Sequence, residues 1–248
     1  MRTPGLSAFV RCKNEEEYIV ASLMSSYRVF DELVVVLNCS TDRTRELVQE
    51  LMPSHPKIRL LDYPYECAPI GAGYLDGVRA APDASLSRYY NWCLEQTSFS
   101  HVCKWDGDMI ATPAFEQVRG LLAATDVIHF DGMDVLGQHT TDLEPRIFRF
   151  DPARARYVDW DLYEVLEHDY SKTLVVDVKC YLHMKLVKKE WRDRPWTSPN
   201  LQATRSVPQT GRPPPPSVLD VKAWLRRAAQ ALRRLKTDEA DGDKRGSA

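Results

Sequence analysis

Short apolar runs alternate with helical patterns over the first 130 residues of this chain. The runs that we interpret as strands lie at 6–11, 33–37, 58–61 and 127–130, with another from residue 102 to a pair of aspartates. Between them, apolar side chains recur at helical spacing. Because the strands and helices alternate, we predict an α/β fold with a doubly wound, mainly parallel sheet flanked by helices.

Polar residues at the expected helix starts predict caps. Asn14 is the expected cap of the first helix, and residues 15–17 place glutamates in its first turn, where they suit the helix dipole. Ser85 is the expected cap of a helix over 86–94. Thr112 is expected to cap a helix that has Pro113 at its first position.

Residues 63–84 show no clear period and contain several prolines and glycines, so we predict a long loop. The segment Gly71-Ala72-Gly73 in this loop does not follow a strand. Its third glycine, Gly77, comes one position too late for a dinucleotide fingerprint. We therefore interpret these glycines as loop residues.

The alternation fades after Asp131. Short strands are predicted at 147–150 and 157–160, and a longer one at 173–183. We expect this half to build the far wall of a cleft rather than to extend the same sheet.

The composition changes again towards the end of the sequence. Residues 197–217 are rich in Pro, Ser and Thr and include four consecutive prolines, which predicts a stiff linker. Residues 218–248 are expected to form a C-terminal amphipathic helix with a basic face, followed by a polar tail from 237. The basic face over 218–236 suits an anionic membrane surface, while docking onto the protein's own domain and dimerisation are the alternatives.

Composition excludes several classes of protein. The formal net charge of -2 argues against a nucleic-acid binder. The 6 cysteines are scattered without CxxC pairs, so neither a zinc site nor a disulfide framework is indicated. There is no signal-peptide core and no apolar run long enough for a membrane span. We expect a cytoplasmic protein with reduced thiols.

The segment Asp106-Gly107-Asp108 carries the clearest chemistry. Ligands of open α/β sheets gather at the carboxyl ends of strands, where these two carboxylates fall. Gly107 lets the backbone bend, so that both side chains reach one Mg²⁺ or Mn²⁺ ion. The alternative is a polar turn that caps the next helix and binds nothing.

Two segments earlier in the chain also combine a strand with a polar turn. Residues 9–16 (Phe-Val-Arg-Cys-Lys-Asn-Glu-Glu) read as a strand and an Asn-Glu-Glu turn, and residues 34–44 as a strand and a Ser-Thr-Asp-Arg-Thr turn. With Asp106-Gly107-Asp108 they resemble the family 2 glycosyltransferases, whose fold is called GT-A. The resemblance implies a GT-A-like domain over 1–196, with a nucleotide-sugar half at 1–112 and an acceptor half at 113–196.

The resemblance also implies roles for particular residues. Asp106 would contact ribose or metal, Asp108 would bind a Mn²⁺ or Mg²⁺ that bridges the donor diphosphate, and His183 is a further metal candidate. Lys104 and Arg88 would neutralise phosphate. The residues expected to cradle the nucleoside are Val10, Arg11, Asn14, Glu15 and Asn38. Leu37 stands where the family commonly has a base-contacting aspartate, which leaves the base open, with UDP or GDP expected.

A later pair of segments indicates the catalytic base. Residues 146–149 (Arg-Ile-Phe-Arg) and 163–166 (Tyr-Glu-Val-Leu) are similar to a family strand and a downstream His-Glu-x-x-Leu turn. The glutamate of that turn lies near the acceptor, so Glu164 is the expected base and Asp161 the second candidate. Asp159 and Glu167 are weaker candidates, and Tyr163 replaces the family's histidine.

These features predict a metal-dependent, inverting glycosyltransferase. It would move a sugar from a nucleotide-diphosphate sugar onto a saccharide or lipid-linked acceptor in bacterial surface polysaccharide or lipopolysaccharide synthesis. Attachment of residues 218–236 to the inner face of the plasma membrane would suit such an acceptor.

Two alternatives stay open. A sugar nucleotidyltransferase would normally carry a glycine-rich loop after the first strand, and residues 11–15 contain no glycine. A non-catalytic carbohydrate-binding protein of the same fold is the other alternative. The aromatic residues Tyr89, Tyr90 and Trp105 are expected in the core rather than stacked on a ligand.

Overall fold

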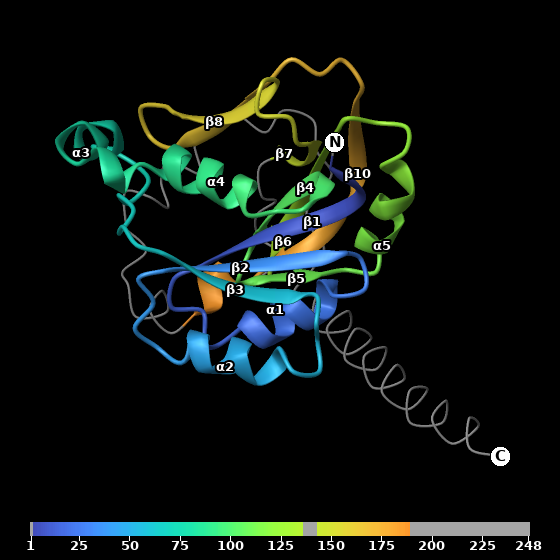
Figure 1. Cartoon of the computed structure of the whole chain (residues 1–248), viewed down its shortest axis with the longest axis horizontal. Coiled ribbons are helices and arrows are strands. Elements are labelled where there is room, and N and C mark those ends of the chain that lie inside the picture. Colours follow the sequence, from blue (N-terminus) through green and yellow to red (C-terminus); the bar gives the residue numbers. More distant parts are fainter. Residues whose placement is uncertain (1, 136–142, 189–248) are drawn as a thin grey trace.

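A large mixed sheet organises the protein. The computed structural model describes residues 2–135 and 143–188. Its eight-stranded sheet has the order β3-β2-β1-β4-β7-β6-β10-β5, in which β5 and β7 run antiparallel to their neighbours (Figure 1). The strands are β1 (Thr3–Cys12), β2 (Glu32–Asn38), β3 (Ile58–Tyr63), β4 (Phe99–Asp106), β5 (Met109–Ala111), β6 (Val127–Asp134), β7 (Glu144–Arg149) and β10 (Thr173–His183). The predicted α/β fold with a mainly parallel sheet is confirmed.

The central strands are apolar on both sides because each face of the sheet is covered. Along β2, Leu33 and Val35 join one core, while Val34 and Val36 join the other. Helices α1 (Ile19–Ser26) and α2 (Thr44–Leu51) lie on one face, and α4 (Leu86–Glu95) lies on the opposite face (Figure 1). Trp105, which is fully buried, stacks on Phe115 of α5 (Phe115–Val118).

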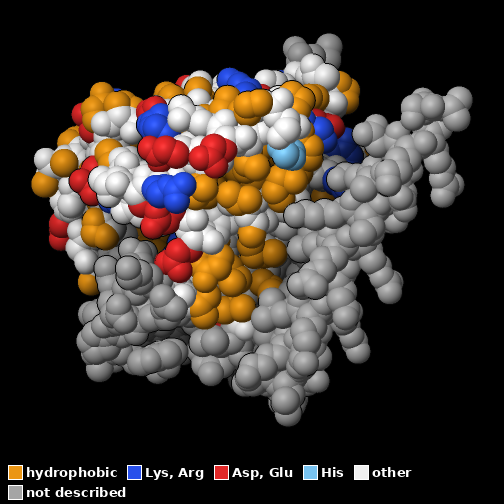
Figure 2. All heavy atoms as spheres, turned by 90° about the horizontal axis from the view of Figure 1, so that it is seen from below, with side chains coloured by type: hydrophobic (Ala, Val, Ile, Leu, Met, Phe, Trp, Pro, Cys, Tyr) orange, Lys and Arg blue, Asp and Glu red, His pale blue; other side chains and the backbone are white. Residues whose placement is uncertain are grey.

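The face formed by α1 and α2 mixes charged and hydrophobic side chains (Figure 2). The exposed large hydrophobic residues of α1 are Val20 and Met24, each only 37% exposed. Within the described residues, no helix has the length and apolarity that crossing a bilayer requires. The predicted linker at 197–217 and the basic helix and tail at 218–248 lie outside the described residues.

The expectation of a separate far wall is wrong for most of the second half. β6, β7 and β10 extend the same sheet, and β7 lies antiparallel between β4 and β6. A strand inserted in this way needs no crossover helix, so the strand–helix alternation in the sequence stops although the sheet continues. Only β8 (Ala155–Asp159) and β9 (Glu164–His168) form a separate two-stranded sheet within the described residues. The segment around Glu164 is therefore a strand and not the expected turn.

The predicted loop over 63–84 contains two short helical segments. These are α3 (Tyr74–Ala80) and a 3₁₀ turn at Pro82–Ala84. Tyr74 is the buried residue of α3, so the helix leaves no apolar period in the sequence.

One of the three predicted caps is confirmed. Ser85 accepts a hydrogen bond from the Arg88 backbone N–H at 3.0 Å, as a cap does. Asn14 instead has a left-handed φ of 57°, and α1 begins only at Ile19. The hydroxyl of Thr112 donates to the carbonyl of Lys179 rather than to a helix start. The helix that Thr112 was expected to cap begins later, at Phe115. In both wrong cases the side chain contacts a neighbouring segment.

Asp159 ties the β8–β9 hairpin to the start of α4. Its carboxylate accepts hydrogen bonds from the Ser85 hydroxyl at 2.7 Å and from the Ser87 backbone N–H at 3.0 Å. The hydroxyl of Tyr74 donates to the same carboxylate. These hydrogen bonds lower the pKa of Asp159 against the opposing effect of its partial burial. The arrangement fixes the position of the hairpin that carries Glu164.

We expect Asp159→Ala to destabilise the fold by about 1–2 kcal/mol, because several donors at the start of α4 lose a charged acceptor. Urea unfolding followed by circular dichroism measures this. Asp161→Ala is the matched control, since Asp161 is exposed and its side chain bonds to no other described residue. Equal stabilities for the two variants would contradict the anchoring role of Asp159.

Candidate functional site

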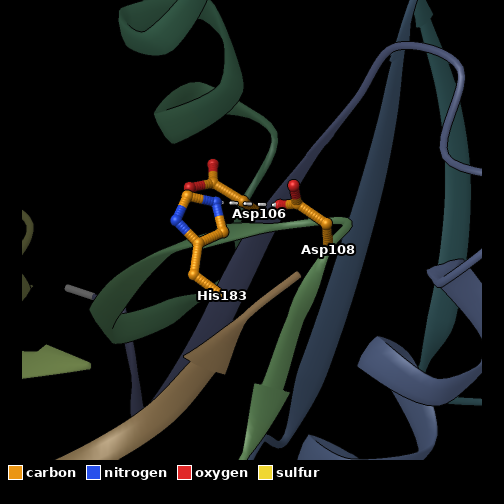
Figure 3. Close-up of side chains that lie close together, drawn as sticks. All are labelled: Asp106, Asp108 and His183. Atoms are coloured by element: carbon orange, nitrogen blue, oxygen red, sulfur yellow. Dashed lines mark ion pairs between the residues drawn. The ribbon is translucent and has the colours of Figure 1, made fainter. Parts of the chain in front are cut away.

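Three potential metal ligands converge at one edge of the sheet. Asp106 ends β4, Asp108 follows in the turn to β5, and His183 ends β10. One ligand atom from each lies within 4.8 Å of the others. Figure 3 shows the imidazole beside the two carboxylates, with His183 Nε2 at 3.3 Å from Asp108 Oδ1. Antiparallel pairing of β5 with β10, which sets Met109 opposite His183, brings the late histidine to the aspartates.

Close packing, rather than a left-handed backbone angle, requires glycine at position 107. A Cβ atom at this position would lie 2.8 Å from Cγ of Glu15 and 3.0 Å from Sγ of Cys12. The backbone N–H of Gly107 donates to the carbonyl of Arg11 at 3.1 Å. The turn between the aspartates is thereby pressed against the end of β1.

Asp106 is held by two arginines. Parallel pairing of β1 with β4 sets Arg11 opposite Asp106, and Arg11 Nε donates to Asp106 Oδ1 at 2.6 Å. A nitrogen of Arg146 lies 3.9 Å from the other carboxylate oxygen. Burial favours the neutral acid, but the positive charges of Arg11 and Arg146 outweigh it and lower the pKa of Asp106 to about 2. The guanidinium of Arg11 also lies over the ring of Tyr90, 4.7 Å from its centre.

Asp108 and Glu15 share one lysine. Lys188 Nζ lies 2.7 Å from Asp108 Oδ2 and 2.7 Å from the Glu15 carboxylate. Burial opposes ionisation of Asp108, but His183 and Lys188 hold its pKa well below the ordinary value. Burial and the charge of Asp108 raise the pKa of Glu15, despite Lys188.

A row of alternating charges leads from Asp106 to Glu164. Arg146 lies 3.3 Å from Glu144, and Lys104 lies 3.3 Å from Glu144 and 3.0 Å from Glu164. The side chains of Lys104, Arg146 and Glu164 are all buried. Burial raises the pKa of Glu144, but Arg146 and Lys104 outweigh it and lower that pKa to about 2. This row joins the metal-ligand group to the β8–β9 hairpin.

Residues 7–82 match the sequence profile described as Glycosyl transferase family 2. Over these residues the chain is similar to that family. The match covers β1, β2 and β3, and thus the segments at 9–16 and 34–44 that carry the resemblance in sequence. No curated protein matches the chain significantly in sequence.

Solved structures extend the likeness over most of the chain. TarS 1–349 of S. aureus in complex with UDP-GlcNAc aligns with a TM-score of 0.53 at 18% identity, covering 81% of this chain and 64% of that one. TarS 1–349 alone aligns with a TM-score of 0.51 at 16% identity, covering 73% and 61%. At these identities the likeness shows the GT-A fold. This chain spans less than two thirds of either TarS structure.

Several residues that were expected to contact the nucleoside make hydrogen bonds or packing contacts within the protein itself. Asn38 is 5% exposed; its amide nitrogen donates to the carbonyl of Tyr65 at 2.6 Å and its oxygen accepts from the Cys67 N–H at 3.3 Å. Asn14 Oδ1 accepts from the backbone N–H of Thr41 at 2.8 Å. Val10 is completely buried in the core. Asn38 and Val10 are thus buried, whereas Asn14 remains partly exposed beside Thr41.

The remaining candidates are divided between the site and the surface. Arg11, Glu15 and Lys104 belong to the charged groups described above, whereas Arg88 is half-exposed and pairs with Asp83. Asp161 is exposed in the hairpin turn. Glu167 is exposed and pairs with Arg156. Tyr89, Tyr90 and Trp105 are buried in the two cores, as expected.

Sequence reasoning missed Lys188 and gave Glu144 and Arg146 no role in the charged site. Lys188 is 173 residues from Glu15 and belongs to no motif. Its one sequence signal is a group of lysines at 185, 188 and 189 directly after His183. Arg146 lies in the segment that resembles the family strand, but the resemblance assigns it no partner.

The lowered pKa of Asp106 predicts a pH-dependent contribution to stability. In the unfolded chain an aspartate ionises near pH 4. Asp106 therefore stabilises the fold fully above about pH 4 and loses its contribution as the pH falls towards the folded pKa of about 2.

We expect Asp106→Asn to be less stable than wild type at neutral pH, with about 2 kcal/mol of the difference disappearing between pH 4 and pH 2. Urea unfolding across that range measures the difference. A difference that stays constant with pH would show that Arg11 and Arg146 do not stabilise the ionised carboxylate.

Proposed function

We propose that this chain is a metal-dependent, inverting glycosyltransferase that uses a nucleotide-diphosphate sugar as donor. The observation that carries the proposal is the convergence of Asp106, Asp108 and His183 at the carboxyl ends of the sheet strands. This is the edge at which open α/β folds bind ligands, and the first strands of the sheet match glycosyl transferase family 2.

The donor set fits a divalent cation. Carboxylate oxygens suit Mg²⁺ and Mn²⁺, and an imidazole nitrogen makes Mn²⁺ the better match. Asp106, Asp108 and His183 would hold the ion, and a bound ion neutralises negative charge that develops on the leaving diphosphate.

UDP is the first nucleotide to test. TarS, which shares the fold, has been solved in complex with UDP-GlcNAc and with UDP. In this chain the amide of Asn38 supports the segment at Tyr65 and Cys67, next to the carboxyl ends of β2 and β3. We propose that this segment faces the base and that Arg11 lies along the floor of the donor site.

Glu164 is the proposed catalytic base. Transfer with inversion needs one group that accepts the proton of the acceptor hydroxyl as that oxygen bonds to the anomeric carbon and the diphosphate leaves. Glu164 is buried at the end of the charged row, and Lys104 orients its carboxylate at 3.0 Å. Asp159, by contrast, is bonded to the start of α4, and Asp161 is exposed.

The proposed acceptor is a saccharide or a lipid-linked glycan of a bacterial surface polysaccharide. A cytoplasmic location, with residues 218–236 held on an anionic membrane surface, remains a prediction from the sequence. That segment lies outside the described residues.

The first test of this function is a thermal-shift panel of UDP, GDP, CDP and TDP with and without Mn²⁺. A ligand at ~100 times its dissociation constant stabilises a protein by about 2.7 kcal/mol, which raises the melting temperature measurably. We expect a Mn²⁺-dependent shift with one nucleotide, and its loss in Asp108→Asn. Wild-type protein that shifts with none of the nucleotides would contradict the proposed function.

Glu164→Gln should retain donor binding and lose about 10²-fold to 10⁴-fold in transfer rate, because the amide cannot accept the proton. Glu167→Gln is the matched control, since it makes the same change on the same strand at an exposed position. Donor hydrolysis and, once an acceptor is found, transfer are measured alongside nucleotide affinity. Near-normal turnover of Glu164→Gln would assign the base to another carboxylate, with Asp161 next.

A further inference from the structure

The segment after β10 brings a lysine back to the metal-ligand group. The backbone N–H of Met184 donates to the carbonyl of Asp108 at 2.9 Å, and a 3₁₀ turn at Lys185–Val187 follows. This path delivers the Lys188 ammonium between Asp108 and Glu15, where the residue is 6% exposed. Lys188 is therefore a built-in cation beside a proposed divalent-cation ligand.

The position of Lys188 matters because three other cations of the site, Arg11, Arg146 and Lys104, are paired with other carboxylates. Arg11 and Arg146 lie on Asp106. Lys104 is bonded to Glu164 and Glu144. Lys188 is the lysine that bridges Asp108 and Glu15 at 2.7 Å from each.

A divalent cation and Lys188 disfavour each other at this site. A cation held by Asp108 Oδ1 would lie close to the ammonium on Oδ2 of the same carboxylate, and like charges at such distances repel strongly in a buried setting. The repulsion falls if the ammonium moves to another anion. A donor diphosphate supplies that anion, since lysine is a common phosphate-binding side chain.

We propose that Lys188 couples divalent-cation binding to diphosphate binding, by neutralising Asp108 and Glu15 in the empty site and transferring to the donor diphosphate when the cation binds. This inference rests on the proposed function, because it takes a nucleotide diphosphate as the ligand. Lys188 is then a diphosphate-binding residue of the loaded site as well as the counter-ion of the empty one.

The proposal predicts opposite changes in two binary affinities. Without Lys188, Mn²⁺ alone gains a carboxylate pair that no ammonium occupies, so its affinity rises. UDP alone loses a positive charge, so its affinity falls. A role for Lys188 that is only structural would weaken both, because damage to the segment disturbs the whole site.

The experiment measures Mn²⁺ binding without nucleotide, by the electron paramagnetic resonance signal of free Mn²⁺. UDP binding is measured by calorimetry in EDTA, at concentrations high enough to titrate the weak binding without metal, and again with saturating Mn²⁺. For Lys188→Ala we expect about tenfold tighter Mn²⁺ binding and about tenfold weaker UDP binding. Lys188→Arg keeps the charge and should restore both affinities towards those of wild type. Lys172→Ala is the matched control and should change neither affinity. Lys172 is exposed and lies directly before the start of β10, at the end opposite to His183.

Lys188→Met retains the apolar stem and serves as the second variant if the alanine variant is poorly folded. Weaker or unchanged Mn²⁺ binding in both variants, or unchanged UDP binding, would overturn the proposal. A wild-type protein that fails to bind UDP even with Mn²⁺ would instead contradict the proposed function. The Mn²⁺ measurement would still show whether Lys188 opposes the cation.

Discussion

Parallel pairing of β1 with β4 is the constraint on which the site depends, because it sets Arg11 opposite Asp106 at one sheet edge. A buried carboxylate is stable only when a cation and hydrogen bonds compensate for its lost hydration. The same requirement continues along the edge, where Arg146, Glu144, Lys104 and Glu164 alternate in sign. The ion pairs of this row therefore hold the strands together at this edge, in addition to the apolar core.

The sequence predicts those parts of the fold whose cause is local. Residues 33–37 form an apolar run because β2 is buried on both faces, and that burial is visible in the sequence alone. The antiparallel β7 and the short β5 were harder to foresee, since each is defined by partners far away in the chain. The helix cap predicted at Asn14 was wrong because the residue types that cap helices also form hydrogen bonds between loops. Asn14 does so by accepting a hydrogen bond from Thr41.

The site shows the same division. Asp106 and Asp108 can be recognised in the sequence because they end an apolar run. His183 joins them only through the pairing of β5 with β10. The cluster of lysines after His183 does not reveal the role of Lys188, because its contact with Glu15 joins residues 173 positions apart. A glycine at position 107 was expected on conformational grounds, but its backbone angle is not left-handed, and the structure gives a steric reason instead, the close approach of Glu15 and Cys12.

The charges of the site also bear on the proposed binding of a cation and a diphosphate. Arg11, Arg146 and Lys104 balance Asp106, Glu144 and Glu164, while Lys188 bridges Asp108 and Glu15. A divalent cation on its own would add positive charge beside Lys188, and a diphosphate on its own would add negative charge beside Asp108. In a weakly screened interior both additions are costly, whereas the pair adds little net charge. The balance of buried charge is thus consistent with the proposed coupling, in which a metal–diphosphate complex binds better than either component.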